Sequence, residues 1–209
     1  MRLNFPHIAL MSMVAMVGPM TVEALADVPF ASDQVVAQKA GALVGDPNSP
    51  VIGNPHADVA IVEFFDYACV YCKAAEPRLE ALVKADKGTK LILKEFPILT
   101  PASMIATKAA LASVRQGKYA QFHEALMNYR GRLDTSVIFD TAKDAGLDVA
   151  RLRKDMAAPE ITDEIIENFN LARSLRIFQT PGFIIGNHIL TGPSEDMDFP
   201  KAVAAARAK

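Results

Sequence analysis

The sequence has little cysteine, no tryptophan and no excess of positive charge. Two Cys in 209 residues exclude a scaffold held by many disulfides, and they are two ligands short of a zinc site built from Cys alone. Lys and Arg number 22 against 24 Asp and Glu, so nucleic-acid binding, which normally requires a basic excess, is not expected. The 51% hydrophobic content is that of a globular protein, and the length suits one domain or one domain with an insertion.

No apolar run reaches the length of a membrane-spanning helix. The longest, residues 8–22, is interrupted by Ser, Gly and Pro, whereas a spanning helix needs about 20 apolar residues. Arg2 precedes this run and Ala24-Leu25-Ala26 follows it, which predicts a cleaved signal peptide of residues 1–26, with an uncleaved anchor as the alternative. The mature chain then begins at Asp27, and its cysteines face an oxidising compartment.

Two predicted strands flank a predicted helix in the first half of the mature chain. Residues 59–65 form a nearly continuous apolar run rich in β-branched and aromatic side chains, which is typical of a strand buried on both faces. Residues 69–87 have a helical pattern, and residues 90–96 form a second strand that ends before a proline. The order strand, helix, strand predicts a parallel βαβ unit.

The rest of the chain predicts a helical insertion followed by a hairpin and a last helix. We expect an N-terminal helix and linker at residues 27–52, and a main domain at 53–209 that carries a helical insertion at about 100–177. Residues 183–191 predict a hairpin around Gly-Asn, and residues 195–207 a helix. Helical patterns occur at residues 35–44, 101–116, 119–129, 134–145, 148–157 and 162–177.

One motif carries chemistry. Cys69-Val70-Tyr71-Cys72 follows a buried strand and opens a helix. Unpaired N–H groups at a helix N-terminus stabilise a thiolate, which is the nucleophile of disulfide exchange, and a second thiol three residues later can close the ring again. The motif therefore predicts dithiol redox chemistry.

Two other interpretations of the cysteine pair remain open. A purely structural disulfide closing so short a loop would contribute only about 2 kcal/mol, compared with about 4.7 kcal/mol for a 100-residue loop. Half of a metal site would need His56, His123 or His188 to converge on the two sulfurs. Otherwise these histidines are expected to be surface or packing residues.

Two stretches together resemble the exported DsbA-like thiol:disulfide oxidoreductases of the thioredoxin superfamily. They are residues 64–72 (FFDYACVYC) and residues 179–183 (QTPGF). The similarity covers about residues 46–207, and a helical insertion fits the DsbA-like branch rather than thioredoxin itself. The resemblance implies an α/β, thioredoxin-like fold with a central mixed sheet, a redox-active disulfide between Cys69 and Cys72, and no cofactor.

The resemblance also implies a role for each residue around the disulfide. Cys69 corresponds to the exposed, attacking cysteine and Cys72 to the one that resolves the mixed disulfide. Pro181 corresponds to a cis proline that faces the disulfide, with Thr180 directly before it. Glu63 corresponds to a buried acid, and because burial raises the pKa of a carboxyl group it can relay the proton of Cys72.

Simpler interpretations exist for several of these residues. Glu63 could be a strand-end acid in contact with water, and Pro181 an ordinary proline at the start of a strand. Asp66 is expected to be a turn or cap residue. Pro77 fits the proline at which active-site helices of this family often kink.

The direction of electron transfer stays open, because oxidases, isomerases and reductases share these residues. Val70 and Tyr71 are expected to tune the thiolate, although many oxidases of the family have His at the position of Tyr71. Thr180 before the proline is more frequent in isomerase-like and copper-resistance relatives. The resemblance favours an oxidase, with an isomerase or reductase as the alternative and a non-enzymatic copper- or zinc-binding protein as a further one.

The resemblance implies a setting and partners. We expect a periplasmic protein whose substrates are exported proteins with cysteines, and a membrane redox partner that oxidises or reduces it again. Nucleic-acid binding and stable membrane insertion after cleavage are not expected.

Overall fold

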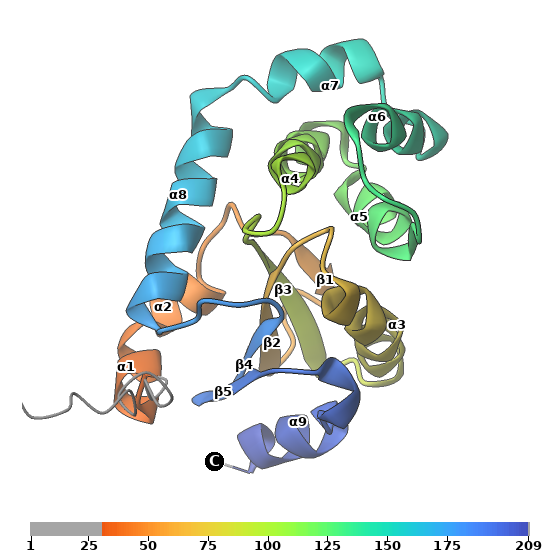
Figure 1. Cartoon of the computed structure of the whole chain (residues 1–209). Helices are drawn as coiled ribbons and strands as arrows, with labels where there is room; N and C mark the ends of the chain where they lie inside the picture. Colours follow the sequence, from red (N-terminus) through yellow and green to blue (C-terminus); the bar gives the residue numbers. More distant parts are fainter. Residues whose placement is uncertain (1–30, 209) are drawn as a thin grey trace, which may run out of the picture.

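The computed structural model describes residues 31–208 (Figure 1). The predicted signal peptide and the predicted mature N-terminus at Asp27 lie outside these residues. The elements run in the order α1 (Asp33–Gln38), α2 (Ala40–Val44), β1 (Val51–Gly53), β2 (Val59–Phe65), α3 (Val70–Ala85), β3 (Thr89–Glu95), α4 (Pro101–Ser113), η2 (Val114–Gln116), α5 (Tyr119–Asn128), α6 (Thr135–Asp144), α7 (Val149–Asp155), α8 (Pro159–Ser174), β4 (Gly182–Ile185), β5 (His188–Thr191), η3 (Ser194–Asp196) and α9 (Phe199–Arg207).

The strands form one mixed sheet in the order β1-β3-β2-β4-β5. β2 and β3 are parallel, which confirms the predicted βαβ unit, and the other neighbouring pairs are antiparallel. The predicted α/β class with a central mixed sheet is therefore confirmed. Gly186, at φ 60°, turns the predicted hairpin between β4 and β5, a backbone conformation that glycine adopts at little cost.

Side chains of β2 alternate between two hydrophobic cores, one on each face of the sheet. Val62 and Phe64 pack against α1, α2 and α8, whereas Ile61 and Phe65 pack against α3, α9 and the helices from α4 to α7. Figure 1 shows α8 and α3 on opposite sides of the sheet. Because successive residues of a strand point to opposite faces, Glu63 faces the α3 side together with Ile61 and Phe65.

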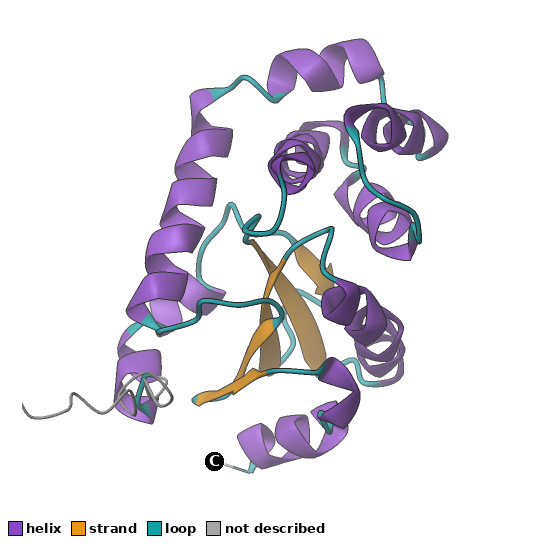
Figure 2. Cartoon of the chain, viewed as in Figure 1, coloured by secondary structure: helices purple, strands orange, loops and turns teal. Residues whose placement is uncertain are grey.

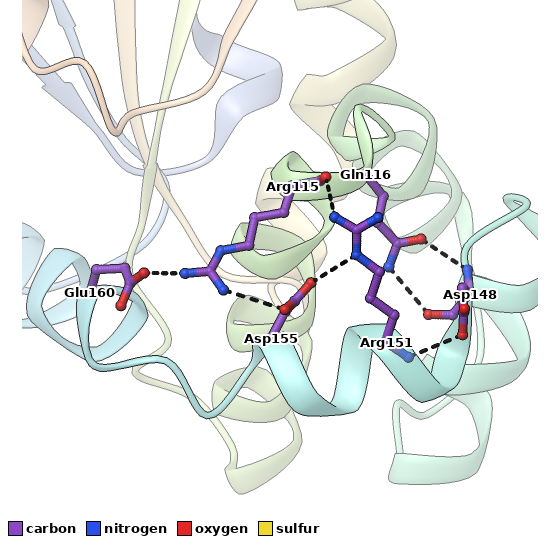
Figure 3. A network of polar contacts seen from close by, with 6 residues as sticks. All are labelled: Arg115, Gln116, Asp148, Arg151, Asp155 and Glu160. Carbon is purple, nitrogen blue, oxygen red and sulfur yellow. Dashed lines mark hydrogen bonds and ion pairs between the residues drawn. The ribbon is translucent and has the colours of Figure 1, made fainter.

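The first helix between β3 and β4 begins at the predicted residue 101. Thr100 caps α4 by accepting a hydrogen bond from the Ser103 N–H (3.0 Å), Pro101 is its first residue, and Gly117 ends the following 3-10 turn at φ 64°. In Figure 2 the helices α4 to α7 form a layer beyond one end of the sheet. Figure 3 shows how the far end of this layer is held by polar contacts among Arg115, Gln116, Asp148, Arg151, Asp155 and Glu160.

Three local expectations are corrected. The predicted helix at 35–44 is two short helices separated at Lys39, because the chain turns there to lay both Val36 and Leu43 into the core. β1 was not predicted, since three residues are too few for a periodic pattern. α8 starts at Pro159, a proline at the first helical position, rather than at 162.

A buried ion pair holds the N-terminal segment against the sheet. Lys94 Nζ of β3 lies 2.7 Å from Asp46 Oδ2, and the Lys94 side chain is only 1% exposed. Asp46 also accepts a hydrogen bond from Ser49 Oγ (2.7 Å). Between residues 31 and 208, no helix is both long enough and apolar enough to cross a membrane.

Candidate active site

The turn between β2 and α3 places the two cysteines just beyond the C-terminal end of the central strand β2. Asp66, fully buried, accepts hydrogen bonds from the Ala68 N–H (2.7 Å), the Ser103 hydroxyl (2.7 Å) and the Leu99 N–H (2.9 Å). These bonds confirm Asp66 as a turn residue and join the turn to the start of α4. Cys69 follows as the N-cap of α3.

Cys69 sits where several donors can reach its sulfur. Its Sγ accepts a hydrogen bond from the Cys72 N–H (3.2 Å), and as a thiol it donates to the Thr180 carbonyl (3.4 Å). Hydrogen bonding with Cys72 is the main reason that the pKa of Cys69 falls from 9.0 to about 6; burial opposes this, and the Thr180 side chain and the Tyr71 N–H lower the pKa further. The predicted acidic thiolate at a helix N-terminus therefore has a structural basis.

The exposed attacking cysteine expected from the sequence is not seen. Cys69 is only 4% exposed, because its side chain turns inward toward the Thr180 carbonyl and the first turn of α3. Its neighbours Val70 and Tyr71 are 69% and 45% exposed and form the surface at this point.

Cys72 has the opposite environment. It is fully buried and is not bonded to Cys69 as a disulfide. Burial raises the pKa of Cys72 well above its ordinary value, and the hydrogen bond with Cys69 and the charges of Glu63 and Cys69 raise it further. In the dithiol form the first sulfur is thus held as a thiolate and the second as a thiol.

The Thr180 carbonyl lies against Cys69, and the peptide bond between Thr180 and Pro181 is cis, as the resemblance implied. β4 starts at the next residue, Gly182, which pairs with Phe64 of β2. The same register that fixes β4 beside β2 therefore brings Thr180 to Cys69, although 111 positions separate them in the sequence.

Glu63 is fully buried behind the cysteines, which contradicts a strand-end acid in contact with water. Neither carboxyl oxygen has a hydrogen-bond partner within the described chain. Burial raises its pKa well above the ordinary value, and the charges of Glu76 and Cys69 raise it further. Burial and these charges favour the protonated form of Glu63, and the charge of Glu63 in turn raises the pKa of Cys72.

Four buried polar residues near the site were not predicted. Tyr67, Glu76, Glu95 and His123 form one hydrogen-bonded chain, with His123 fully buried rather than at the surface. One sequence signal points to Glu76, which lies four residues after Cys72 and thus on the same helix face. The other members come from elements distant in sequence.

An apolar cleft opens beside the active-site turn. Its volume is about 850 Å³, and it extends between the start of α3 and the helices from α4 to α6. Val70 and the half-exposed Leu99 lie on its wall, and Arg130 and Arg132 on its rim. Within residues 31–208, no three His, Cys, Asp or Glu side chains are placed to hold a metal ion, so the metal-site interpretation gains no structural support.

Comparison with known proteins now identifies the family. The model of the DsbA-like thioredoxin domain matches residues 60–203. The chain belongs to the DsbA-like thioredoxin family. Its predicted thioredoxin-like fold and its membership of a family of thiol:disulfide oxidoreductases are thereby confirmed.

Individual relatives agree with this assignment. A thioredoxin-like oxidoreductase from Silicibacter pomeroyi DSS-3 is 40% identical, with a TM-score of 0.77 over 81% of this chain and 98% of that one. The thiol-disulfide exchange protein alpha-DsbA2 from Wolbachia pipientis is 29% identical, with a TM-score of 0.76 over 84% of this chain and 94% of that one. The Na⁺/H⁺ antiporter NhaA 3 of Salinispora tropica is 26% identical over 164 residues, but the match spans only 25% of its length.

Proposed function

We propose that this protein is an exported thiol:disulfide oxidoreductase that oxidises cysteines of other exported proteins through a Cys69–Cys72 disulfide. The observation that carries the proposal is the opposite environment of the two sulfurs. The pKa of Cys69 is lowered to about 6, whereas that of Cys72 is raised. A structural disulfide or a metal pair has no need for such a difference.

The proposed reaction transfers two electrons from a substrate dithiol to the protein. A substrate thiolate attacks Sγ of Cys69, the Cys69–Cys72 bond breaks, and Cys72 leaves as a thiolate that takes a proton from Glu63. The second substrate thiolate then attacks the substrate sulfur of the mixed disulfide, which releases Cys69 as a thiolate. The substrate gains a disulfide and loses two protons to the solvent, and Glu63 is left as a carboxylate.

The oxidising direction is supported by the environment of Cys69. A dithiol form whose thiolate is stabilised is easier to reach, so the corresponding disulfide is the stronger oxidant. Tyr71 carries no positive charge, and we therefore expect a weaker oxidant than relatives with His at this position. An isomerase or reductase remains the alternative, and the equilibrium constant of the purified protein with glutathione distinguishes it from an oxidase.

Location and partners follow from the same proposal. The predicted signal peptide and the family support the periplasm, where a membrane redox partner would oxidise the dithiol again. The apolar cleft next to Val70 supports polypeptides rather than small thiols as substrates. Glu63, Thr180 and Pro181 are proposed as catalytic residues, with Val70 and Tyr71 tuning the thiolate.

The test compares substitutions of the two cysteines. Cys69→Ser should abolish exchange, because it removes both the disulfide that a substrate thiolate attacks and the Cys69 thiolate that attacks a substrate disulfide in the reverse direction. Cys72→Ser should still allow the Cys69 thiolate to attack a substrate disulfide, but no Cys72 thiol remains to release the mixed disulfide, so that substrate proteins accumulate as covalent adducts on Cys69 in non-reducing gels. Adducts with both variants, or with neither, would remove the basis for the two roles.

A further inference from the structure

Behind Cys72 lies a chain of four buried polar side chains that the proposed reaction does not use. Glu76 Oε1 is 3.2 Å from His123 Nε2, His123 Nδ1 is 3.0 Å from the Tyr67 hydroxyl, and that hydroxyl is 2.9 Å from Glu95 Oε1. All four side chains are at most 1% exposed. The chain joins α3, α5, the turn before α3 and the end of β3 by direct hydrogen bonds.

With a neutral His123 imidazole, the protons of this chain can be arranged in two ways. The Tyr67 hydroxyl has one proton but two neighbours that can accept it, His123 Nδ1 and Glu95 Oε1. If Tyr67 donates to His123, then Glu95 must be protonated and donate to Tyr67, and His123 donates from Nε2 to Glu76. If Tyr67 donates to Glu95, then His123 carries its proton on Nδ1 and Glu76 must be protonated to fill the remaining hydrogen bond.

The two ends of the chain differ in how well they hold a negative charge. Glu95 receives hydroxyl donors from Thr107 to Oε2 (2.7 Å) and from Tyr119 to Oε1 (3.0 Å), in addition to Tyr67. Hydrogen bonds to the charged form favour it. Glu63, by contrast, has no hydrogen-bond donor within the described chain, so a carboxylate created there is poorly stabilised.

The chain reaches the dithiol through Glu76. Glu76 lies one helical turn after Cys72, its Oε2 is buried without a partner in the described chain, and its charge acts on Glu63. Burial raises the pKa of Glu95 to about 8, which supports a protonated Glu95 as the resting state at neutral pH. The titratable groups around His123 are Glu76 and Glu80 on α3, Tyr67 before α3, Glu95 on β3, and Tyr119 and Glu124 on α5.

We propose that Glu95, Tyr67, His123 and Glu76 form a proton relay. The relay shifts its protons when the Cys69–Cys72 disulfide is reduced to the dithiol, and His123 carries the proton between its two ring nitrogens. The proposal rests on the proposed function in that Glu63 gives its proton to Cys72. Glu95 then passes its Oε1 proton to Tyr67, Tyr67 passes its own to His123 Nδ1, and His123 passes its Nε2 proton to Glu76. Protons balance, and no oxidant or reductant is consumed. The negative charge ends on Glu95, and a neutral Glu76 faces the new Glu63 carboxylate.

His123 is thus a positioning residue that acts on the cysteines through two acids. Its signature is a change of tautomer: the proton is on Nε2 in the disulfide form and on Nδ1 in the dithiol form. A histidine that only fills space or supports the fold would keep one tautomer in both forms.

Nitrogen NMR of the ¹⁵N-histidine-labelled protein at neutral pH tests this directly, because it distinguishes a protonated from an unprotonated ring nitrogen. His123→Gln identifies the signal, and the exposed His56 and His188 serve as internal references that should not respond. The relay is supported if Nδ1 of His123 gains a proton when the disulfide is reduced. It is overturned if Nδ1 has the same protonation in both forms.

Two tyrosine variants provide a matched pair. Tyr67 and Tyr119 are both buried and both donate to Glu95 Oε1, but only the Tyr67 hydroxyl is bonded to His123. Tyr67→Phe should abolish the change at His123 and slow reduction by a dithiol by about threefold to tenfold, whereas Tyr119→Phe should keep the change. Equal behaviour of the two variants would contradict transfer through Tyr67.

The outcome separates this relay from the proposed function. Absence of thiol exchange by the unmodified protein would contradict the proposed function whatever His123 does. Normal exchange, together with an unchanged His123, would contradict only the relay.

Discussion

At the scale of single residues, two sulfurs three positions apart have pKa values shifted in opposite directions. Cys69 is bonded by the N–H groups of a helix start, whereas Cys72 lies one turn inside and receives burial and negative charge instead. The contrast comes largely from position along α3, because the two residues between the cysteines, Val70 and Tyr71, are uncharged. A substitution that shifts the first residue of α3 would therefore change the pKa values of both cysteines together.

This contrast predicts a pH dependence of stability. The pKa of Cys69 is about 6 in the folded dithiol form and 9.0 ordinarily, so the unfolded chain binds one more proton between these values and the free energy of unfolding rises with pH there. The gain is lost as pH falls through about 6, and above about 9 the raised pKa of Cys72 reverses the slope. In the disulfide form neither cysteine titrates, so this pH dependence of the free energy of unfolding is absent.

Urea unfolding of both redox forms at several pH values checks this expectation, with thiolate absorbance giving the midpoint of Cys69. The stability of the dithiol form relative to the disulfide form should increase from pH 6 to 8. A thiolate midpoint near the free-cysteine value of roughly 8.5 would contradict the role of the helix start.

What the sequence could reveal about the site depends on how its residues are arranged along the chain. Cys69 and Cys72 could be predicted as a redox pair because their motif coincides with the start of a helix. Functional roles for Pro181 and Glu63 could be predicted only from the family resemblance. The chain of Tyr67, Glu76, Glu95 and His123 could not be predicted, because its members come from separate elements and meet only after the helices have docked on the sheet.

At the scale of elements, patterns long enough to repeat were predicted well. β2 occupies residues 59–65 as expected, and α4 begins at Pro101, the first residue of the helical pattern predicted there. β1 was missed because its three residues depend on pairing with β3 rather than on their own pattern. The prediction of one helix at 35–44 is wrong for the same reason, because tertiary packing rather than periodicity determines where the segment divides into two helices.

The cleft between α3 and α4 yields a prediction about substrate size. Leu99 is 50% exposed on the cleft wall, so Leu99→Asp should place a charge where an apolar substrate segment lies. We expect exchange with a cysteine-containing polypeptide to slow about threefold to tenfold, since covering half of a Leu contributes on the order of 1 kcal/mol. Exchange with glutathione should change little, because glutathione is too small to fill the cleft.

Val114→Asp provides the control for this prediction. Val114 is 49% exposed on η2 but does not line the cleft. The two variants should therefore have similar solubility and stability. Equal slowing of polypeptide exchange in both would rule out a specific role of the cleft.

At the scale of the whole molecule, the N-terminal segment is held by a charge buried in the sheet. Asp46→Asn would remove the carboxylate that pairs with the buried Lys94, and loss of one partner of a buried pair typically costs several kcal/mol. Because Asp46 is partly exposed and Glu164 also interacts with Lys94, we expect a loss of about 2–4 kcal/mol in the free energy of unfolding.

Denaturant unfolding of Asp46→Asn beside Asp58→Asn measures this loss. Asp58 pairs with Arg207 at the surface, where both side chains are largely exposed, so its substitution should have little effect. The pKa of Asp46 is lowered in the fold, although burial opposes the bonds that lower it. Its contribution should therefore be present at neutral pH and disappear as pH falls through that lowered pKa. A loss for Asp46→Asn no larger than for Asp58→Asn would show that the pair contributes nothing.

Both edges of the sheet are short, and this affects how the molecule meets unfolded chains. β1 and β5, the outermost strands, have three and four residues, so they offer few unpaired backbone groups to an incoming strand. Under the proposed function the protein repeatedly meets extended polypeptide, because it acts on cysteines before its substrates have folded. With so little free edge, it can hold such a chain through one sulfur and a cleft without adding it to its own sheet, and can let it go once exchange is complete.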